Sequence, residues 1–566
     1  MRIKLVAVNG RYTHSCLALY YVRNELARHL PAGEVELLQF ALNDPYYQTL
    51  LRIAAGKADA LFFSVYIWSA HFIKRLVIDL ARLLPETPIV LGGPQAPFMG
   101  EGLPPSCTVV AGEVEGLPPG FYRDLAAGGL ARSYAAEAGR PFAMPYREED
   151  FSTTLANRQI YYESTRGCPF GCTYCLSAAS RGVFSLEPGQ VEEELARLVG
   201  HGPPVVRFVD RTFNAHPGRA LALWQFLLSL PGTTCFHFEI APELFSEAMF
   251  DFLATVPPGR FQFEIGLQST NPETLAAINR NNDMARIAAN IGRLVAMDNI
   301  HLHVDLILGL PFETGESFRR SFNDVFALAP HHIQMGLLKV LPATPISRQT
   351  EAFGLIACQE PPYEVLASGW LTQPELAELY WLGQCVESFC NNRFFPSLWS
   401  YLRRAEPDPY GFFTGLLTVA HHHRFFELAR TQELMSRILM EMAVARLDRE
   451  LFAELLRFDW LRSGHRFLPD HLPGAPLIAT RDRLYHLLPL EMAPLYHGRD
   501  RNDFFKKGLF LDCSAQLLAE VGLASGKGPG TVCFPPREKE GVLGLQRALL
   551  LPDAATLGAG HRRPRH

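Results

Sequence analysis

The stretch Arg166-Gly167-Cys168-Pro169-Phe170-Gly171-Cys172-Thr173-Tyr174-Cys175 decides how this sequence is interpreted. Its three cysteines follow a C-x-x-x-C-x-x-C spacing, so one tight loop offers three thiolates to a metal. A four-iron cluster is normally held by four cysteines, and a structural zinc by four protein ligands. A set of three therefore predicts a cluster in which one iron stays open to bind a reactant.

The spacing, with aromatic Tyr174 directly before the last cysteine, resembles the cluster loop of the radical S-adenosylmethionine (SAM) enzymes. The resemblance implies that Cys168, Cys172 and Cys175 hold a [4Fe-4S] cluster whose open iron binds the amino and carboxylate groups of SAM. In that family an electron from the cluster splits the sulfonium and gives a 5′-deoxyadenosyl radical. The cofactor supplies the difficult chemistry, while the protein positions it and excludes water.

Other interpretations of the loop are a zinc knuckle, an electron-transfer cluster and three unrelated buried thiols. Zinc usually takes a second Cys or His pair at short spacing, and none follows this loop. The other cysteines are scattered, at positions 16, 107, 235, 358, 385, 390, 513 and 533. With an odd total of 11 cysteines a disulfide framework is not expected, and the scattered thiols are typical of small buried apolar residues.

Length and composition describe an ordinary soluble protein of two to four domains. The chain has 566 residues, 53 basic and 58 acidic residues, a formal charge of −5, and 48% hydrophobic and 20% charged positions. No strongly basic balance points to a nucleic-acid partner. We find no apolar segment long enough to span a bilayer, and Met1–Val8 is typical of a first strand rather than a signal peptide, which favours the cytoplasm.

Residues 1–130 alternate short apolar runs with amphipathic stretches, which predicts a Rossmann-like, doubly wound parallel sheet in an α/β protein. The expected strands are Ile3–Val8, Val35–Gln39, Ala60–Val65, Ile89–Leu91 and Thr108–Ala111, with helices such as Leu17–His29 and Ala70–Leu84 between them. In such sheets ligands bind at the carboxyl ends of the strands. Three of these ends, at residues 9–14, 64–69 and 92–94, carry unusual polar, aromatic or glycine residues.

This segment is similar to the cobalamin-binding domain that precedes the radical SAM domain in many fused enzymes. The similarity rests on Leu91-Gly92-Gly93-Pro94 and on Gly112-Glu113-Val114-Glu115. It implies a cobalamin site that includes Ser64, Tyr66, Gly92 and Gly93, where missing side chains let a bulky corrin approach the backbone. The motif Asp-x-His-x-x-Gly is absent from the first loop, so His14 is expected to be a polar loop residue and not a cobalt ligand. The alternative is a degenerate Rossmann-like domain that contacts substrate or a partner.

A linker and then a barrel are expected after the first domain. Residues 131–158, with Pro141, Pro145 and mixed charge, predict the linker. Six further strand-like runs within residues 159–345 predict the partial (β/α)6 radical SAM barrel rather than a closed barrel of eight strands. These runs lie at residues 161–164, 205–210, 235–240, 261–269, 301–311 and 333–342. The first delivers the cysteine loop at its carboxyl end, where (β/α) barrels place catalytic residues.

Polar residues on the barrel strands are candidates to bind SAM. Glu264 lies on a strand of alternating pattern, and the resemblance implies that it accepts hydrogen bonds from the ribose hydroxyls; otherwise it is a solvated or salt-bridged residue. Gln268 lies in the same Glu-x-Gly-x-Gln-Ser run, residues 264–269. It is a weaker candidate because a glutamine there also suits a turn. Asp210 is expected to touch SAM or substrate, or else to pair with Arg211. Glu239 is expected to hold the SAM ammonium or to serve the barrel interior.

Residues 346–566 predict a mostly helical extension. Helical periodicity covers Gln373–Phe389, Gly411–Leu428 and Thr431–Phe458, whose apolar stripes are typical of core packing. The adjacent residues His421–His423 point in different directions on a helix, which argues against a metal site. Gly558–His566 is small and basic, and we expect it to be disordered.

These features support one leading function and two alternatives. The leading hypothesis is a radical SAM enzyme that cleaves SAM at a [4Fe-4S] cluster and, with cobalamin, methylates or rearranges an unactivated carbon of a small molecule or peptide. An external donor such as flavodoxin or ferredoxin would reduce the cluster. One alternative is cobalamin-independent radical chemistry, such as a cyclisation. The other is a non-catalytic iron–sulfur protein for binding or electron transfer.

Overall fold

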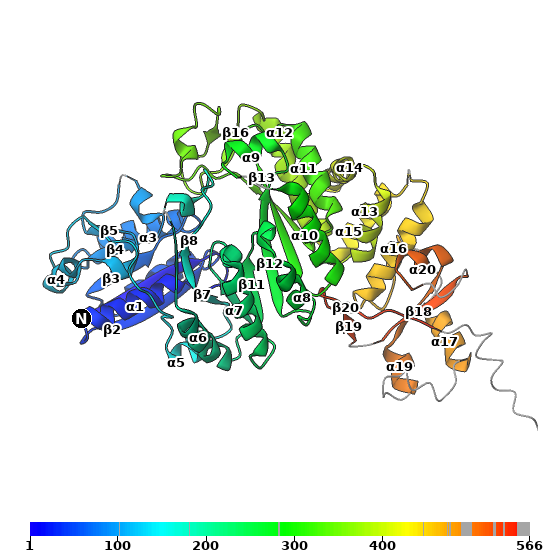
Figure 1. The fold of residues 1–566 in the computed structure, drawn as a ribbon, viewed down its shortest axis with the longest axis horizontal. Helices are drawn as coiled ribbons and strands as arrows, with labels where there is room; N and C mark the ends of the chain where they lie inside the picture. The colour runs from blue at the N-terminus through cyan, green and yellow to red at the C-terminus, as the bar shows by residue number, and fades with distance from the viewer. Residues whose placement is uncertain are drawn as a thin grey trace, which may run out of the picture.

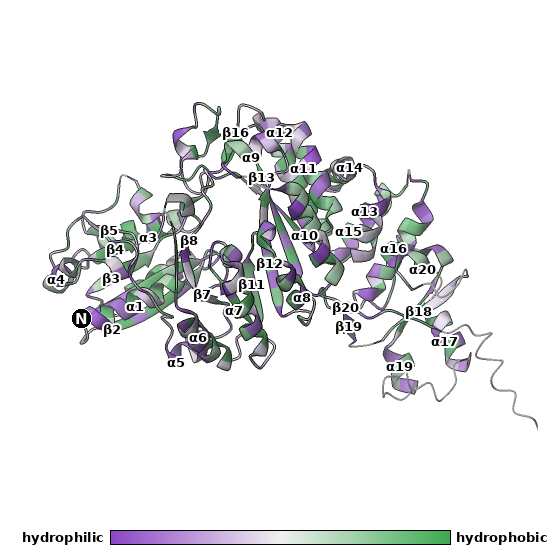
Figure 2. Ribbon diagram, viewed as in Figure 1, coloured by the Kyte–Doolittle hydropathy of each residue, from purple (hydrophilic) through white to green (hydrophobic). Residues whose placement is uncertain are grey.

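The computed structural model describes residues 1–100, 102–179, 182–280, 283–444, 446–472, 474, 477–487, 501–523, 528–535 and 538–551. Three parts follow one another along the longest axis of the molecule: a parallel α/β domain, a partial barrel and a mostly helical C-terminal region (Figure 1). Apolar residues run along the strands of both large sheets (Figure 2). The predicted fold class is confirmed.

The first sheet has six parallel strands in the order β2-β1-β3-β4-β5-β6. They are β1 (Arg2–Asn9), β2 (Glu34–Ala41), β3 (Ala60–Ser64), β4 (Ile89–Gly92), β5 (Cys107–Ala111) and β6 (Ser133–Ala135). The accompanying helices are α1 (Leu17–His29), α2 (Tyr46–Ala54), α3 (Ala70–Leu83) and α4 (Pro119–Ala127). Strand order reverses between β1 and β3, and doubly wound sheets bind ligands at the carboxyl ends of strands beside such a point.

The sheet extends beyond residue 130, into the segment predicted as a linker. Residues 133–135 form β6, which pairs in parallel with the edge of β5 through its backbone. This run is short and has no apolar pattern that would predict a strand. The rest of the connection contains helix α5 (Glu148–Ser152). Arg23 of α1 donates to both carboxylate oxygens of buried Asp150 at 2.6 and 2.7 Å, which fastens the connection to the first domain.

The central region is a sheet of six parallel strands in the order β14-β13-β12-β11-β10-β7. The strands are β7 (Ile160–Tyr162), β10 (Val205–Phe208), β11 (Cys235–Glu239), β12 (Phe261–Gln268), β13 (His301–Leu308) and β14 (His332–Leu337). The helices are α6 (Pro188–Gly200), α7 (Pro217–Ser229), α8 (Glu247–Leu253), α9 (Pro272–Ala277), α10 (Met284–Met297) and α11 (Gly315–Ala327). The end strands β7 and β14 do not pair, so the barrel is partial, as predicted.

The edge of β14 is covered by a side chain of the C-terminal region. The Asn391 amide accepts a hydrogen bond from Ile333 N at 3.0 Å and donates one to Ile333 O at 2.9 Å. One buried side chain thus satisfies both backbone groups that a seventh strand would bind.

The C-terminal region is mostly helical, with a small antiparallel sheet, β17-β18-β21, that periodicity did not indicate. Its helices are α12 (Gln373–Cys385), continued by a π-helical turn (Val386–Cys390), α13 (Pro396–Ala405), α14 (Pro409–His422), α15 (Gln432–Met442), α16 (Arg449–Arg462), α17 (Leu477–Leu487), α19 (Arg501–Lys507) and α20 (Ala515–Glu520). Its strands are β15 (Ile356–Ala357), β16 (Val365–Ala367), β17 (Leu509–Cys513), β18 (Gly530–Phe534), β19 (Lys539–Glu540), β20 (Leu545–Gln546) and β21 (Leu549–Leu550).

The C-terminal region differs from the sequence-based expectation over residues 431–458. The stretch predicted as one helix over Thr431–Phe458 is two helices, α15 and α16, because the chain turns after Met442. The tail Gly558–His566 lies outside the described residues. Within the described part of the chain, no helix has both the length and the apolar character that a membrane crossing requires.

Candidate active site at the barrel mouth

The cysteine loop follows β7 and a short strand, β8 (Thr165–Gly167), which pairs with β9 (Val183–Ser185). Its backbone is anchored on the segment after α9, since Thr173 N donates to Ile278 O at 3.0 Å and the Asn279 amide to Gly171 O at 2.8 Å. A Cβ on Gly171 would lie 2.9 Å from that Asn279 nitrogen, so a larger residue would have to displace the end of the Asn279 side chain. The sequence places the loop at the carboxyl end of the barrel, and these contacts hold it there.

The three predicted cluster ligands are free thiols. Cys172 is buried, and Cys168 and Cys175 are partly buried. Cys168 Sγ lies 3.6 Å from Thr212 Oγ1, and Cys172 Sγ lies 3.7 Å from Arg280 Nη1. Burial raises the pKa of the Cys172 thiol, and the charge and hydrogen bond of Arg280 oppose this.

The donor set fits an iron–sulfur cluster in its chemistry, because three soft sulfur ligands come from one loop beside a cationic side chain. In the described residues, however, no three His, Cys, Asp or Glu side chains are gathered so as to hold a metal ion. The Cys168 side chain contacts Thr212 instead. Cluster binding therefore requires these side chains to turn toward one another.

Tyr174 and Gln268 both lie near Arg280. Arg280 donates to the carbonyl of Gly266 as well as to Cys172, and Tyr174 packs partly buried beside the same thiol. Gln268 has a left-handed φ of 73°, and a Cβ on Gly266 would lie only 2.2 Å from its Nε2. The Gly-x-Gln spacing on β12 thus lets the Gln268 side chain fold back toward the cysteine loop.

Asp210 is fully buried and holds the segment that leads into the cysteine loop. Its carboxylate accepts hydrogen bonds from Ser164 N at 2.8 Å and from the Ser164 hydroxyl. Burial raises the pKa of Asp210, and the bonds from Ser164 and Thr165 oppose this. The carboxylate of Asp210 therefore binds Ser164 and not Arg211, the partner considered from the sequence.

Glu264 and Glu239 both point into the barrel but differ in charge environment. Glu264 lies 3.0 Å from His237 Nε2 and 3.5 Å from Arg207 Nη2. Burial would raise its pKa, but His237, His303 and Arg207 outweigh burial and lower the pKa to about 2. For Glu239 burial dominates and, against Arg211, raises the pKa to about 7. Glu264 is therefore a charged, ion-paired residue, whereas Glu239 exchanges its proton near neutral pH.

The candidate cobalamin residues lie together at the carboxyl ends of β3 and β4. Buried Ser64 lies near the Tyr66 hydroxyl and makes no hydrogen bond of ordinary geometry. The Tyr66 ring stacks on half-exposed Trp68 at 4.4 Å and 8°. A Cβ on Gly92 would meet no atom within 4 Å, whereas Gly93 has φ 98° and would place a Cβ 2.7 Å from Val65 O. Gly92 thus leaves open space, while Gly93 is needed for the backbone itself.

The carboxyl ends of the two large sheets face each other. His14, after β1, contacts the hydroxyl of Tyr161 on β7 through Nδ1 at 2.6 Å. Tyr66 of the first domain lies close enough to Arg211 and Glu163 of the barrel for their charges to influence its pKa, which burial raises. The first domain therefore borders the barrel mouth that carries the cysteine loop.

Arg166, two residues before Cys168, joins the two sheets, and sequence reasoning gave it no role. Its guanidinium forms ion pairs at 2.9 Å with Glu113, Glu115 and Glu163. Burial raises the pKa of Glu163 to about 7 against the effect of Arg166. All three partners lay in stretches named above, but only the fold brings Gly112–Glu115 to the cysteine loop.

Two family profiles match the chain. The radical SAM superfamily matches residues 162–325, and a family described as a protein of unknown function (DUF4080) matches residues 351–485. The first match begins at the end of β7 and ends in α11, so it covers the cysteine loop and strands β10 to β13 of the barrel. It confirms the resemblance seen in the cysteine spacing.

Individual proteins are similar to parts of the chain. The cobalamin-dependent radical SAM methyltransferase TokK of Streptomyces tokunonensis is 27% identical over 206 residues, covering 34% of this chain and 30% of that protein. The 2-(S-pantetheinyl)-carbapenam-3-carboxylate methyltransferase of Streptantibioticus cattleyicolor is 25% identical over 348 residues, covering 53% of this chain and 50% of that protein. The chain thus spans half or less of the length of these relatives.

A solved structure shares the fold over most of the chain. It is the cobalamin-dependent S-adenosylmethionine radical enzyme OxsB with aqua-cobalamin bound, with a TM-score of 0.55, 14% identity, and coverage of 81% of this chain and 80% of that chain. At this identity the likeness concerns the fold alone. Residues 162–325, which include the cysteine loop, thus form a radical SAM domain, and parts of the chain are similar to methyltransferases, of which TokK is described as cobalamin-dependent.

Proposed function

We propose that this chain is a radical SAM enzyme that uses a [4Fe-4S] cluster, SAM and cobalamin to methylate an unactivated carbon. The observation that carries the proposal is the approach of the two sheets: the carboxyl ends of the first sheet border the barrel mouth through His14–Tyr161 and the ion pairs of Arg166. A corrin-sized ligand bound to the first domain would therefore lie beside the cysteine loop. The similarity to named cobalamin-dependent methyltransferases supports methylation over rearrangement.

The cysteine loop is proposed to hold three irons of the cluster through Cys168, Cys172 and Cys175. When bound, such a cluster supplies the electron that cleaves SAM reductively. Arg280, 3.7 Å from the Cys172 sulfur, stabilises the thiolate by its charge. Tyr174 packs beside the same sulfur and keeps water away from it. Asp210 fixes the approach of the loop by binding Ser164.

SAM is proposed to extend from the loop along the inner face of β12 and β11. Gln268, folded toward Arg280, is placed to contact it, and Glu239 can accept or donate a hydrogen bond near neutral pH because its pKa is about 7. Glu264 is proposed to accept hydrogen bonds from the ribose hydroxyls of SAM. Its carboxylate is already paired with His237 and Arg207, so the hydroxyls would have to share it with them.

Cobalamin is proposed to lie over the ends of β3 and β4. The open space above Gly92, the Ser64 hydroxyl without a hydrogen bond of ordinary geometry, and the stack of partly buried Tyr66 on half-exposed Trp68 fit a large, flat, partly apolar ligand. The substrate is proposed to be a small molecule or peptide, the electron donor a flavodoxin or ferredoxin, and the place of reaction the cytoplasm.

The test is anaerobic reconstitution with iron and sulfide followed by reduction with SAM present. We expect 5′-deoxyadenosine to form and corrin absorbance to stay with the protein after gel filtration. Cys172→Ala should abolish nucleoside formation, whereas Cys358→Ala, a partly buried thiol outside the loop, should leave it unchanged. Nucleoside without retained corrin would exclude cobalamin and keep the radical chemistry. A reducible cluster with no nucleoside would indicate electron transfer or binding instead.

A further inference from the structure

The described residues enclose a cavity at the end of the barrel opposite the cysteine loop. Its volume is about 300 Å³, and it is lined by residues from the first halves of the strands, such as Gln262, the second residue of β12, and His301, the first residue of β13. A water molecule takes about 30 Å³, so the cavity has room for a small organic molecule. The exposed side chains of Gln334 and Arg393 lie at its rim, so it opens to solvent.

The lining of this cavity has an unbalanced positive charge. Its carboxylate, Glu264, is already engaged by Arg207 at 3.5 Å and by His237 at 3.0 Å. Arg393 makes no hydrogen bond or ion pair with any residue that the structure describes, and burial lowers its pKa. An arginine in a cavity without a counterion is a ready partner for an oxyanion, because its planar guanidinium can donate two parallel hydrogen bonds.

His301 supplies an unused neutral donor beside Arg393, and His237 has an unpaired ring nitrogen that can accept a hydrogen bond. Burial, then Arg393 and neighbouring histidines, lower the pKa of His301 to about 2, so this ring stays neutral. His237 is only 5% exposed, lines the cavity and has a buried Nδ1 without a hydrogen-bond partner among the described residues. A buried polar nitrogen left unsatisfied costs free energy that a bound ligand would recover.

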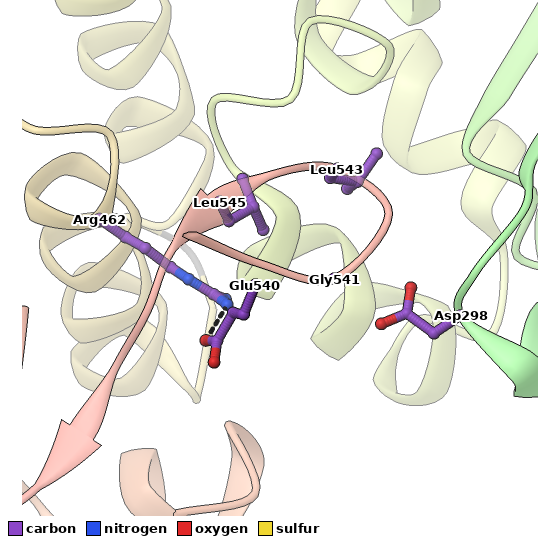
Figure 3. A pocket seen from close by; sticks show the side chains of 6 residues that line it. All are labelled: Asp298, Arg462, Glu540, Gly541, Leu543 and Leu545. Carbon is purple, nitrogen blue, oxygen red and sulfur yellow. Dashed lines mark hydrogen bonds and ion pairs between the residues drawn. The ribbon is translucent and has the colours of Figure 1, made fainter. Parts of the chain in front are cut away.

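The other large cavity lacks these properties. It measures about 380 Å³ and lies between the β19–β20 hairpin, Arg462 of α16 and Asp298 (Figure 3). Arg462 points to Glu540 and pairs with it at 2.8 Å, so the positive charge there is already compensated. Asp298 adds a second carboxylate. This cavity therefore offers nothing specific to an anion.

We infer that the amino-terminal mouth of the partial barrel is a second ligand site, which binds a small molecule through a carboxylate or phosphate head group held by Arg393 and Arg207. Neutral His301 donates a further hydrogen bond. Arg393 comes from the DUF4080 region, so the site exists only where that region meets the barrel. Glu264, the proposed ribose contact, lines the same cavity, so this site adjoins the proposed SAM site.

The test is calorimetric titration of the full-length, reconstituted protein with inorganic phosphate and, separately, with succinate, without SAM or reductant. We expect saturable binding of at least one anion at one site per chain. Arg393→Gln should weaken it about tenfold, because a charge-assisted pair is lost. Gln334→Glu, which places a carboxylate at the exposed rim, should weaken it similarly. The phosphate and succinate arms show which head group the site takes.

Two controls keep the result interpretable. Arg82→Gln removes an exposed arginine of α3 in the first domain and should leave binding unchanged. Melting temperatures of all variants should stay close to that of the parent. Absence of binding by both anions, or equal binding by the parent and Arg393→Gln, would overturn the inference. Since SAM is absent, the outcome does not depend on whether the proposed radical chemistry is correct.

Discussion

Gly93 and its neighbour Gly92 have different roles that the sequence motif cannot separate. Gly93 has a left-handed φ of 98°, and a Cβ there would lie 2.7 Å from the backbone oxygen of Val65. Gly92 has open space around it. We expect Gly93→Ala to lower the free energy of unfolding by about 1–3 kcal/mol, because backbone strain and a backbone clash are combined.

Urea denaturation followed by circular dichroism measures this difference. Gly92→Ala serves as the matched control and should cost less than about 1 kcal/mol. Equal losses in the two variants would show that Gly93 is not the constrained position. Corrin retention, measured separately, should respond to a larger residue at position 92.

Glu239 is expected to make stability depend on pH. Burial raises its pKa from 4.5 to about 7, so between these values the folded chain keeps a proton that the unfolded chain has lost. The free energy of unfolding should therefore fall as the pH rises from 5 to 7.5. Glu163, raised to about 7 as well, adds to this trend, whereas Glu264, with a pKa of about 2, titrates below this window.

Glu239→Gln should remove part of that slope. We expect the variant to be more stable than the parent by about 2 kcal/mol at pH 7.5 and nearly equal to it at pH 5. Urea denaturation at several pH values provides the measurement. An unchanged slope would mean that Glu239 is charged throughout this range.

The strand β8 and the Gly112–Glu115 loop are coupled through Arg166. Because the ion pairs of Arg166 with Glu115 and Glu163 are largely buried, whereas Glu113 is exposed, Arg166→Gln leaves two buried carboxylates without this partner and should cost about 3–5 kcal/mol. In a double-mutant cycle Glu115→Gln should cost less in the Arg166→Gln background than in the parent.

Iron content per chain after reconstitution gives a second readout. It should fall in Arg166→Gln, because the loop that carries Cys168 loses its anchor to the first domain. Arg140→Gln, which breaks an exposed pair with Glu137, should change neither stability nor iron content measurably. Additive costs in the cycle would argue against direct coupling.

Elements with strong periodicity were predictable and those without it were not. Leu17–His29 was expected as a helix and is α1, because its apolar spacing and length are decisive. The three-residue strand β6 and the sheet β17-β18-β21 were missed. Short edge strands form because a neighbouring strand offers backbone hydrogen bonds, and their own sequence carries little β-strand signal. The turn between α15 and α16 was missed because apolar residues continue through it.

The candidate site was predictable only where residues adjacent in sequence act together. The cysteine loop is such a case. The contacts of Asp210 with Ser164, and of Arg166 with Glu115, join residues 46 and 51 positions apart, so their partners depend on the tertiary fold. The sequence could not distinguish a cofactor contact from a structural clamp at Asp210, because both use a carboxylate at a strand end.

The C-terminal region fastens the first domain to the barrel. Gln95, in the loop after β4, donates from its buried amide to the hydroxyl of Tyr363, and His71 of α3 contacts Pro361 O at 3.0 Å. Tyr363→Phe should lower the free energy of unfolding by about 1–3 kcal/mol, because the Gln95 amide loses its partner. Denaturation by urea measures the loss, and Tyr47→Phe, an exposed tyrosine of α2, is the control. Equal effects would contradict the contact.

Asn391 has a consequence for how copies of this molecule behave when they are concentrated. An open sheet offers its free strand edge to a neighbouring chain, and pairing of such edges leads to stacking and fibres. Since one amide already binds both backbone groups of Ile333, this edge of β14 is capped locally against a foreign strand. On the open barrel, one pair of outward-facing backbone groups is thereby unavailable to a foreign strand.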